Sequence, residues 1–201
     1  MSKPIYASAL DVKRPIIPGF YPDPSIVRVG GTFYLANSTF EYGPGVPIHS
    51  SKDLVNWKFE GHSLPTVKHM DITGMVNSMG IFAPTIRQHN GKFYMITTLT
   101  DRKRQVLVNA ENPAGPWSDP VRIDLFGIDP DLFWDENGDC YMTYASLPLN
   151  GFGQVKINMN EAYHNTIACR PRQRIALSQQ GMALHRHTVR SNARVDEVHR
   201  W

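Results

Sequence analysis

Two aspartates that each precede a proline are the residues of this chain best suited to acid–base chemistry. They are Asp23 and Asp129, and a similar motif between them carries Ala83 at the matching position. Asp-Pro is a common turn dipeptide, so one occurrence would more often be structural than catalytic. Two occurrences in one repeat register favour function, because carboxylates converging on a pocket repel each other and lose hydration. Their pKa values then separate, and the pair can divide the roles of acid and base.

The segments that these residues open are built alike. They read DPSIVRVGGTFYLANS from Asp23, APTIRQHNGKFYMITT from Ala83 and DPDLFWDENGDCYMTYA from Asp129. Each has a β-rich run, a turn dipeptide and a second run with a tyrosine; the dipeptides are Gly30-Gly31, Asn90-Gly91 and Asn137-Gly138. Asn-Gly between apolar runs is the strongest short hairpin signal, since both residues tolerate a positive φ. The repeat therefore predicts three β-hairpins.

A second pair of strands follows the first two hairpins. Residues 46–59 and 104–120 each show a strand, a polar turn and a tryptophan. Four strands per unit and unit starts 60 and 46 residues apart are typical of β-propeller blades. The alternative is a β-sandwich, but its strands would not share the opening motif and the turn. Because the innermost strands of blades surround one axis, we expect Asp23 and Asp129 to face one pocket.

The predicted fold class is all-β, a propeller that is incomplete in this chain. Residues 1–155 hold two full units and the first hairpin of a third, about two and a half blades. A propeller closes only when no blade is left with an open side. We therefore expect an unpaired strand edge at residues 139–147, of the kind that recruits other chains.

The composition changes near Val155. Residues 1–155 carry 13 Lys and Arg against 15 Asp and Glu, whereas residues 156–201 carry 8 against 3 and only two of the 21 aromatic residues. We interpret 1–155 as the partial propeller domain and 156–201 as a basic tail that continues no blade, disordered or derived from a frameshift. An RNA-binding tail is the alternative, but aromatic residues for base stacking are missing.

The front part of the chain resembles glycoside hydrolase family 43, the β-xylosidase and α-L-arabinofuranosidase group. The resemblance rests on PGFYPDPSIVRVGGTFYLANSTFEYGPGVPIHSSKDLVNW, GIFAPTIRQHNGKFYM and GIDPDLFWDENG, three motifs in the family's order within residues 14–155. It implies a five-bladed propeller and hydrolysis with inversion. It also implies that Asp23 is the general base and that Asp129 orients the general acid and tunes its pKa.

The family's general acid is absent from this chain. That acid is a Glu in a Glu-Gly-Pro-His type motif, and Glu161 and Glu197, the only glutamates after Val155, have no such context. The chain is thus expected to be the N-terminal part of a glycosidase, truncated and inactive as written. The alternative is a non-catalytic sugar-binding propeller or an inactive remnant. Xylosidase and arabinofuranosidase activities fit the sequence equally.

The same resemblance places sugar-binding side chains at Phe40, Phe82 and Ile128. Sugars stack their C–H faces on aromatic rings, and relatives usually carry Trp at the second position and often Phe at the third. Core packing is the alternative for both phenylalanines. We assign no role to His49 or His69.

Other functions find no support in the sequence. Cys140 and Cys169 form neither a disulfide framework nor a metal-ligand spacing. No cofactor, metal, nucleic acid or membrane partner is predicted, only a xylo- or arabino-oligosaccharide substrate, and the oligomeric state is left open. The N-terminus MSKPIYASAL lacks the apolar run of a secretory signal, so a cytoplasmic location is expected.

Overall fold

The described part of the chain forms three antiparallel sheets, and within each sheet the strands that follow one another in sequence are paired. The computed structural model describes residues 15–100, 104–146, 152–157, 159, 173–177 and 184–187. The first sheet comprises β1 (Ser25–Val29), β2 (Thr32–Ala36), β3 (Gly45–Ser51) and β4 (Lys58–Leu64). The second comprises β5 (Thr85–His89), β6 (Lys92–Leu99), β7 (Arg104–Ala110) and β8 (Val121–Ile123). The third comprises β9 (Gly127–Trp134), β10 (Cys140–Ser146), β11 (Phe152–Ile157), β12 (Gln173–Leu177) and β13 (Leu184–His187).

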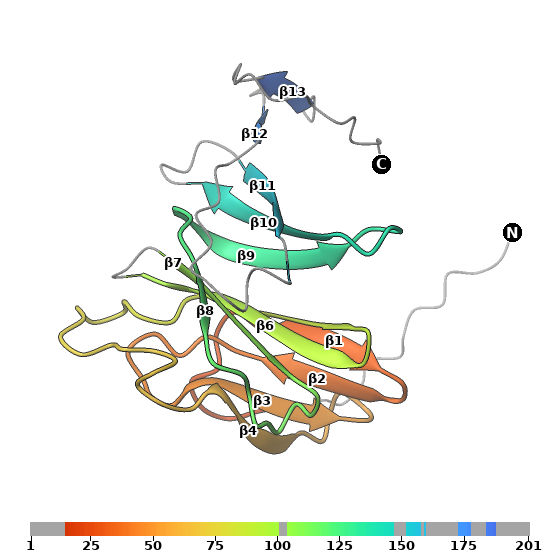
Figure 1. Cartoon of the computed structure of the whole chain (residues 1–201). Coiled ribbons are helices and arrows are strands. Elements are labelled where there is room, and N and C mark those ends of the chain that lie inside the picture. The colour runs from red at the N-terminus through yellow and green to blue at the C-terminus, as the bar shows by residue number, and fades with distance from the viewer. Residues whose placement is uncertain are drawn as a thin grey trace, which may run out of the picture.

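The sheets are stacked in chain order, with the second sheet in the middle (Figure 1). Their first strands lie together, since β1 contacts β5 and β5 contacts β9. One core cluster joins the first and second sheets and includes Ile48 and Met95. Another joins the second and third sheets and includes Ile96 and Leu132. Alternate residues of β6 thus feed two cores, which is the period-2 geometry of a strand buried on both faces.

The first two hairpins have the predicted two-residue turns. Asn90 and Gly91 both have positive φ, 47° and 77°, which is the backbone that Asn-Gly favours. The third turn is longer, because β9 ends at Trp134 and β10 begins at Cys140. There the Asp135 carboxylate accepts hydrogen bonds from the backbone N–H of Asn137 and of Asp139, at 3.0 and 2.9 Å.

The third sheet continues further than the sequence predicted. The strand edge expected at residues 139–147 is covered, because β11 pairs with β10 from Cys140–Ile157 to Ala145–Phe152. The prediction that residues 156–201 add no strand is wrong for two segments, β12 and β13, which extend the sheet beyond β11. The open edge of β11 offers unpaired N–H and C=O groups, and an extended segment of any composition can pair with them. Apart from these two strands, residues 156–157 at the end of β11 and residue 159, the tail lies outside the described residues.

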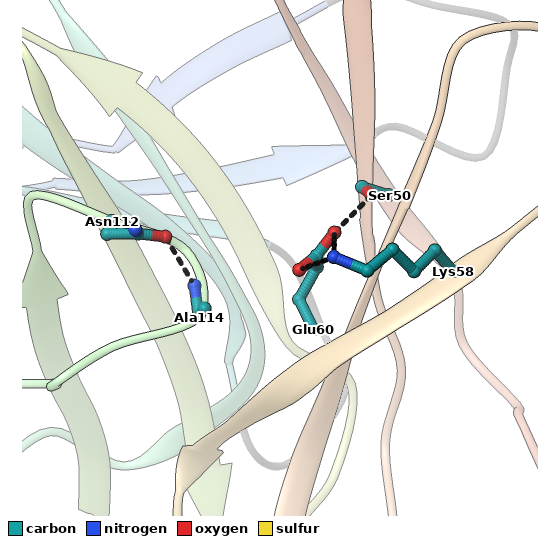
Figure 2. Close-up of polar contacts among 5 residues, drawn as sticks. All are labelled: Ser50, Lys58, Glu60, Asn112 and Ala114. Atoms are coloured by element: carbon teal, nitrogen blue, oxygen red, sulfur yellow. Dashed lines mark hydrogen bonds and ion pairs between the residues drawn. The ribbon is translucent and has the colours of Figure 1, made fainter.

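The outer strand of the first sheet lies against a turn of the second. The Asn112 side chain accepts the backbone N–H of Ala114 at 2.9 Å in the turn between β7 and β8 (Figure 2). A Cβ at Gly61 would lie 3.2 Å from the Ala114 carbonyl oxygen, so glycine permits this approach. The Ser50 hydroxyl donates to Glu60 and lowers the pKa of that carboxyl, against the raising effect of burial. The close approach of Gly61 to Ala114 is thus one contact between the first two sheets besides their shared core.

Candidate functional site

Asp23 lies just before β1 and its backbone is left-handed. Its φ is 52°, a region that Asp tolerates better than most residues. Its side chain is exposed, and its Oδ2 accepts a hydrogen bond of 2.6 Å from the hydroxyl of Ser38. Among the residues that the structure describes, the other carboxylate oxygen has no hydrogen-bond donor, so it can accept one from solution.

Asp129 is held in a matching backbone conformation by an irregularity in β9. Its φ is 54°. The register between β9 and β10 shifts between the pairs Thr143–Asp131 and Ala145–Ile128. Two residues of β9, Asp129 and Pro130, therefore stand opposite one residue of β10, which is a β-bulge that redirects a side chain.

The charge of Asp23 affects the ionisation of Asp129. The pKa of Asp129 is raised, first by burial and second by the negative charge of Asp23. Asp23 precedes the inner strand of the first sheet and Asp129 lies on that of the third, with β5 between them. Both side chains are exposed, and the carboxyl of Asp129 holds its proton more readily than an ordinary aspartate does, because its pKa is raised. Such a difference between two carboxyls is suited to separate acid and base roles.

A hollow of about 390 Å³ opens beside Asp23 between β1 and β5. Its lining consists of residues that precede or begin these two strands: Asp23, Pro24, Ser25, Ile26, Ala83, Pro84, Thr85 and Arg87. Arg87 forms an ion pair of 2.7 Å with Asp131 of β9. This pair ties the second sheet to the strand that carries Asp129.

The two predicted sugar-binding phenylalanines are brought together. The rings of Phe40 and Phe82 meet edge to face with centroids 5.3 Å apart, and both are partly buried. Phe20, which is 53% exposed, contacts Phe40 and Tyr42 at 6.0 and 5.3 Å. The third predicted residue, Ile128, is partly buried in β9 beside Asp129.

The two histidines that the sequence left without a role are structural. His49 is buried between the rings of Tyr21 and Phe59. Both ring nitrogens of His69 are engaged, with the Thr66 hydroxyl at 2.8 Å and with the Ser118 carbonyl, to which Nε2 donates, at 3.2 Å. Across the described residues, no group of His, Cys, Asp and Glu is arranged to hold a metal ion. Nor does that part of the chain contain a helix long and apolar enough to cross a membrane.

Sequence reasoning missed the groups that support the Asp23 loop. Asn37 and Ser38 follow β2 and both are buried. The Asn37 amide donates to the Tyr21 carbonyl, and the Ser38 hydroxyl donates to the Asp23 carboxylate. The repeat contained the signal, because Thr97 and Thr98 hold the same positions after Tyr94 that Asn37 and Ser38 hold after Tyr34.

Comparison with known proteins identifies the family. The family model for glycosyl hydrolases family 43 matches residues 12–185. The chain belongs to this family. The matched range passes Val155, at which the sequence motifs end, and takes in β12 of the tail.

Two curated relatives are named for activity on xylosides or arabinosides. The chain is 51% identical over 131 residues to a xylosidase/arabinosidase of Butyrivibrio fibrisolvens, covering 64% of this chain and 25% of that protein. It is 48% identical over 124 residues to a non-reducing end α-L-arabinofuranosidase of Bacteroides ovatus, covering 60% and 23%. This family 43 chain thus spans about a quarter of the length of these curated relatives.

The fold is shared with a solved enzyme of the family. A xylan β-1,4-xylosidase from Bacillus halodurans C-125 superposes with a TM-score of 0.70 at 39% identity, covering 75% of this chain and 32% of that chain. The three sheets therefore correspond to part of a larger fold in that enzyme.

Proposed function

We propose that this family 43 chain supplies the general base and the orienting carboxylate of a glycosidase that removes terminal xylose or arabinose units with inversion. The electrostatic effect of Asp23 on the pKa of Asp129 carries this proposal, because the inner strands beside these two carboxylates, β1 and β9, both contact β5. In the complete protein the three sheets would be blades of a five-bladed propeller. The sequence predicted that this chain holds about two and a half of these blades.

Asp23 is the proposed general base. Its Oδ2 accepts the Ser38 hydroxyl, and the other oxygen can accept a proton from a water that attacks the anomeric carbon. In an inverting enzyme this water enters on the face opposite the leaving group. Asp129, with its raised pKa, is proposed to orient the general acid on the leaving-group side.

The general acid is proposed to come from outside these 201 residues. The Glu-Gly-Pro-His type motif of the family does not occur in them, and Glu161 and Glu197 lie outside the described residues. Leaving groups of high pKa require protonation as they depart. We therefore propose that this chain alone binds a sugar and hydrolyses neither xylosides nor arabinosides.

The substrate is proposed to be a xylo- or arabino-oligosaccharide. Two relatives are named for xylosidase and arabinofuranosidase activity. The edge-to-face pair of Phe40 and Phe82 offers an apolar wall for the C–H face of a sugar ring. A sugar-binding protein without turnover is the alternative that the sequence left open, and the relatives named as glycosidases do not favour it.

A chimera tests the proposal. Residues 1–146 of this chain, which end with β10, are joined to the remainder of the Butyrivibrio relative, and aryl xyloside and arabinoside hydrolysis is measured. We expect an active chimera that Asp23→Asn impairs on the order of 10²–10⁴-fold, since an amide cannot take the proton of water. The matched control is Asp53→Asn, which changes an exposed aspartate of the turn between β3 and β4. An Asp23→Asn chimera with near-full activity would show that the base is another residue.

A further inference from the structure

Ser38 is buried, yet its hydroxyl is aimed at the exposed carboxylate of Asp23. Its side chain is 0% exposed and lies 2.6 Å from Oδ2 of Asp23. The carbonyl of Pro22, at 3.4 Å, is the other acceptor within reach. A hydroxyl has one proton to donate, and the short contact to a charged oxygen is the stronger of the two.

The neighbouring residue fixes the backbone on which this carboxylate stands. Asn37 is 1% exposed, and its Nδ2 donates to the carbonyls of Tyr21 at 2.8 Å and Pro22 at 3.1 Å. The backbone N–H of Ser38 donates to Pro22 as well, at 3.1 Å. Asn37-Ser38-Thr39 has the pattern of a glycosylation acceptor, but here its amide is buried and engaged. The pair thus clamps the residue before Asp23 and the carboxylate itself.

The second repeat unit has Ala83 in place of Asp23, so it shows which partner the residue matching Ser38 takes when no carboxylate is present. Thr97 corresponds to Asn37, and its hydroxyl donates to the Phe82 carbonyl at 2.7 Å. Thr98 corresponds to Ser38, but Ala83 offers it no acceptor, and its hydroxyl donates instead to Oε1 of Gln105 at 2.7 Å. The backbone clamp is therefore shared by both units, while the bond to a carboxylate occurs where the unit has Asp.

We propose that Ser38 is a positioning residue for Asp23, holding Oδ2 so that the other carboxylate oxygen faces the reacting water. The inference deepens the proposed function, since it assigns how the base is aimed. Without the Ser38 hydroxyl, Asp23 would be free to swing towards solvent. Repulsion from Asp129 would drive it that way.

The test follows the ionisation of Asp129 in the 201-residue chain by carboxyl ¹³C NMR. Asp23→Asn should lower the pKa of Asp129, because the charge of Asp23 is one of the two causes that raise it. Ser38→Ala should shift that pKa in the same direction by a smaller amount. Ser38→Thr keeps a hydroxyl and should restore the wild-type value. Ser63→Ala removes another fully buried hydroxyl of the same sheet and should leave it unchanged.

The outcomes separate this inference from the proposed function. An Asp129 pKa that stays put or rises in Ser38→Ala overturns the positioning role, whatever the chimera does in hydrolysis. In the active chimera, Ser38→Ala should lower kcat by roughly tenfold with little change in KM, as expected for one charge-assisted hydrogen bond. An inactive chimera speaks against the proposed function and leaves the NMR result standing.

A measurement on the wild-type chain guards against a variant that does not fold. The Ser38 hydroxyl proton should exchange slowly with solvent and give an observable resonance, because it is buried and bonded to a carboxylate. Asp23→Asn should shift that resonance. A hydroxyl proton that exchanges too fast to observe would contradict the bond and the role.

Discussion

The left-handed backbone at Asp23 and Asp129 is a conformation that few residues adopt without cost. Both have φ just above 50°, and such positions cost on the order of 1–3 kcal/mol unless the surroundings impose them. At Asp23 the surroundings are the bonds from Asn37 and Ser38, and at Asp129 they are the bulge against β10. Two different devices produce the same local geometry, which indicates that the orientation of the carboxylates, rather than sheet regularity, is maintained.

At the same scale, Phe82 should control how tightly the sugar is held. Phe82→Trp enlarges the stacking surface and should strengthen binding of xylose or arabinose to the chain, whereas Phe82→Ala should weaken it by roughly three- to tenfold. Phe133→Ala is the matched control, because that ring is 40% exposed and stacks on Tyr141. Titration followed by NMR gives the dissociation constants. If all three variants bound the sugar equally, Phe82 would not be part of the sugar-binding site.

At the scale of elements, the sequence predicts the features that depend on local residue types, but not those that depend on pairing between strands. The Asn90-Gly91 turn and the strands around it follow from residue types alone, because positive φ and alternation are local properties. The bulge at Asp129 and the pairing of β11 with β10 depend on neighbouring strands, and no local pattern encodes them. Asp23 and Asp129 were singled out from their repeat register. Ser38 stands in the same repeat register as Thr98, but the register alone does not say that its hydroxyl bonds to a carboxylate, because that bond depends on the fold of the Asp23 loop.

The first sheet should lose stability in mild acid. His49 and His62 both have pKa values lowered from 6.5, by burial in each case and at His49 also by the charge of His62. A lowered folded-state pKa means that the folded state binds fewer protons, so stability is full above about pH 6.5 and falls as the pH drops below it. His49→Phe keeps an aromatic ring between Tyr21 and Phe59 without a titrating group.

Thermal unfolding between pH 7 and pH 5 measures this effect. The wild-type Tm should fall more over this interval than the Tm of His49→Phe, since carboxylates that titrate in both proteins cancel in the comparison. Equal falls in the two proteins would show that His49 is not protonated at the expense of folding.

At the scale of the whole molecule, the second sheet is the element on which both cores depend. Met95 and Ile96 are neighbours in β6 and both are 0% exposed, yet they belong to different clusters. Met95 packs in the cluster shared with the first sheet, and Ile96 in the cluster shared with the third. The order of the sheets in Figure 1 follows from this division of one strand between two faces.

Truncating each of these neighbours should therefore loosen a different end of the molecule. Met95→Ala and Ile96→Ala each leave a cavity in a close-packed core and should cost about 2–5 kcal/mol. Hydrogen exchange should quicken chiefly in β1–β4 for Met95→Ala and chiefly in β9–β11 for Ile96→Ala, because local opening follows the contacts that are lost. The two variants differ by one position in the same strand, so each is the control of the other. Identical exchange patterns would mean that the three sheets open as a single cooperative unit, in which case the effect of either cavity spreads through the shared strand to both cores.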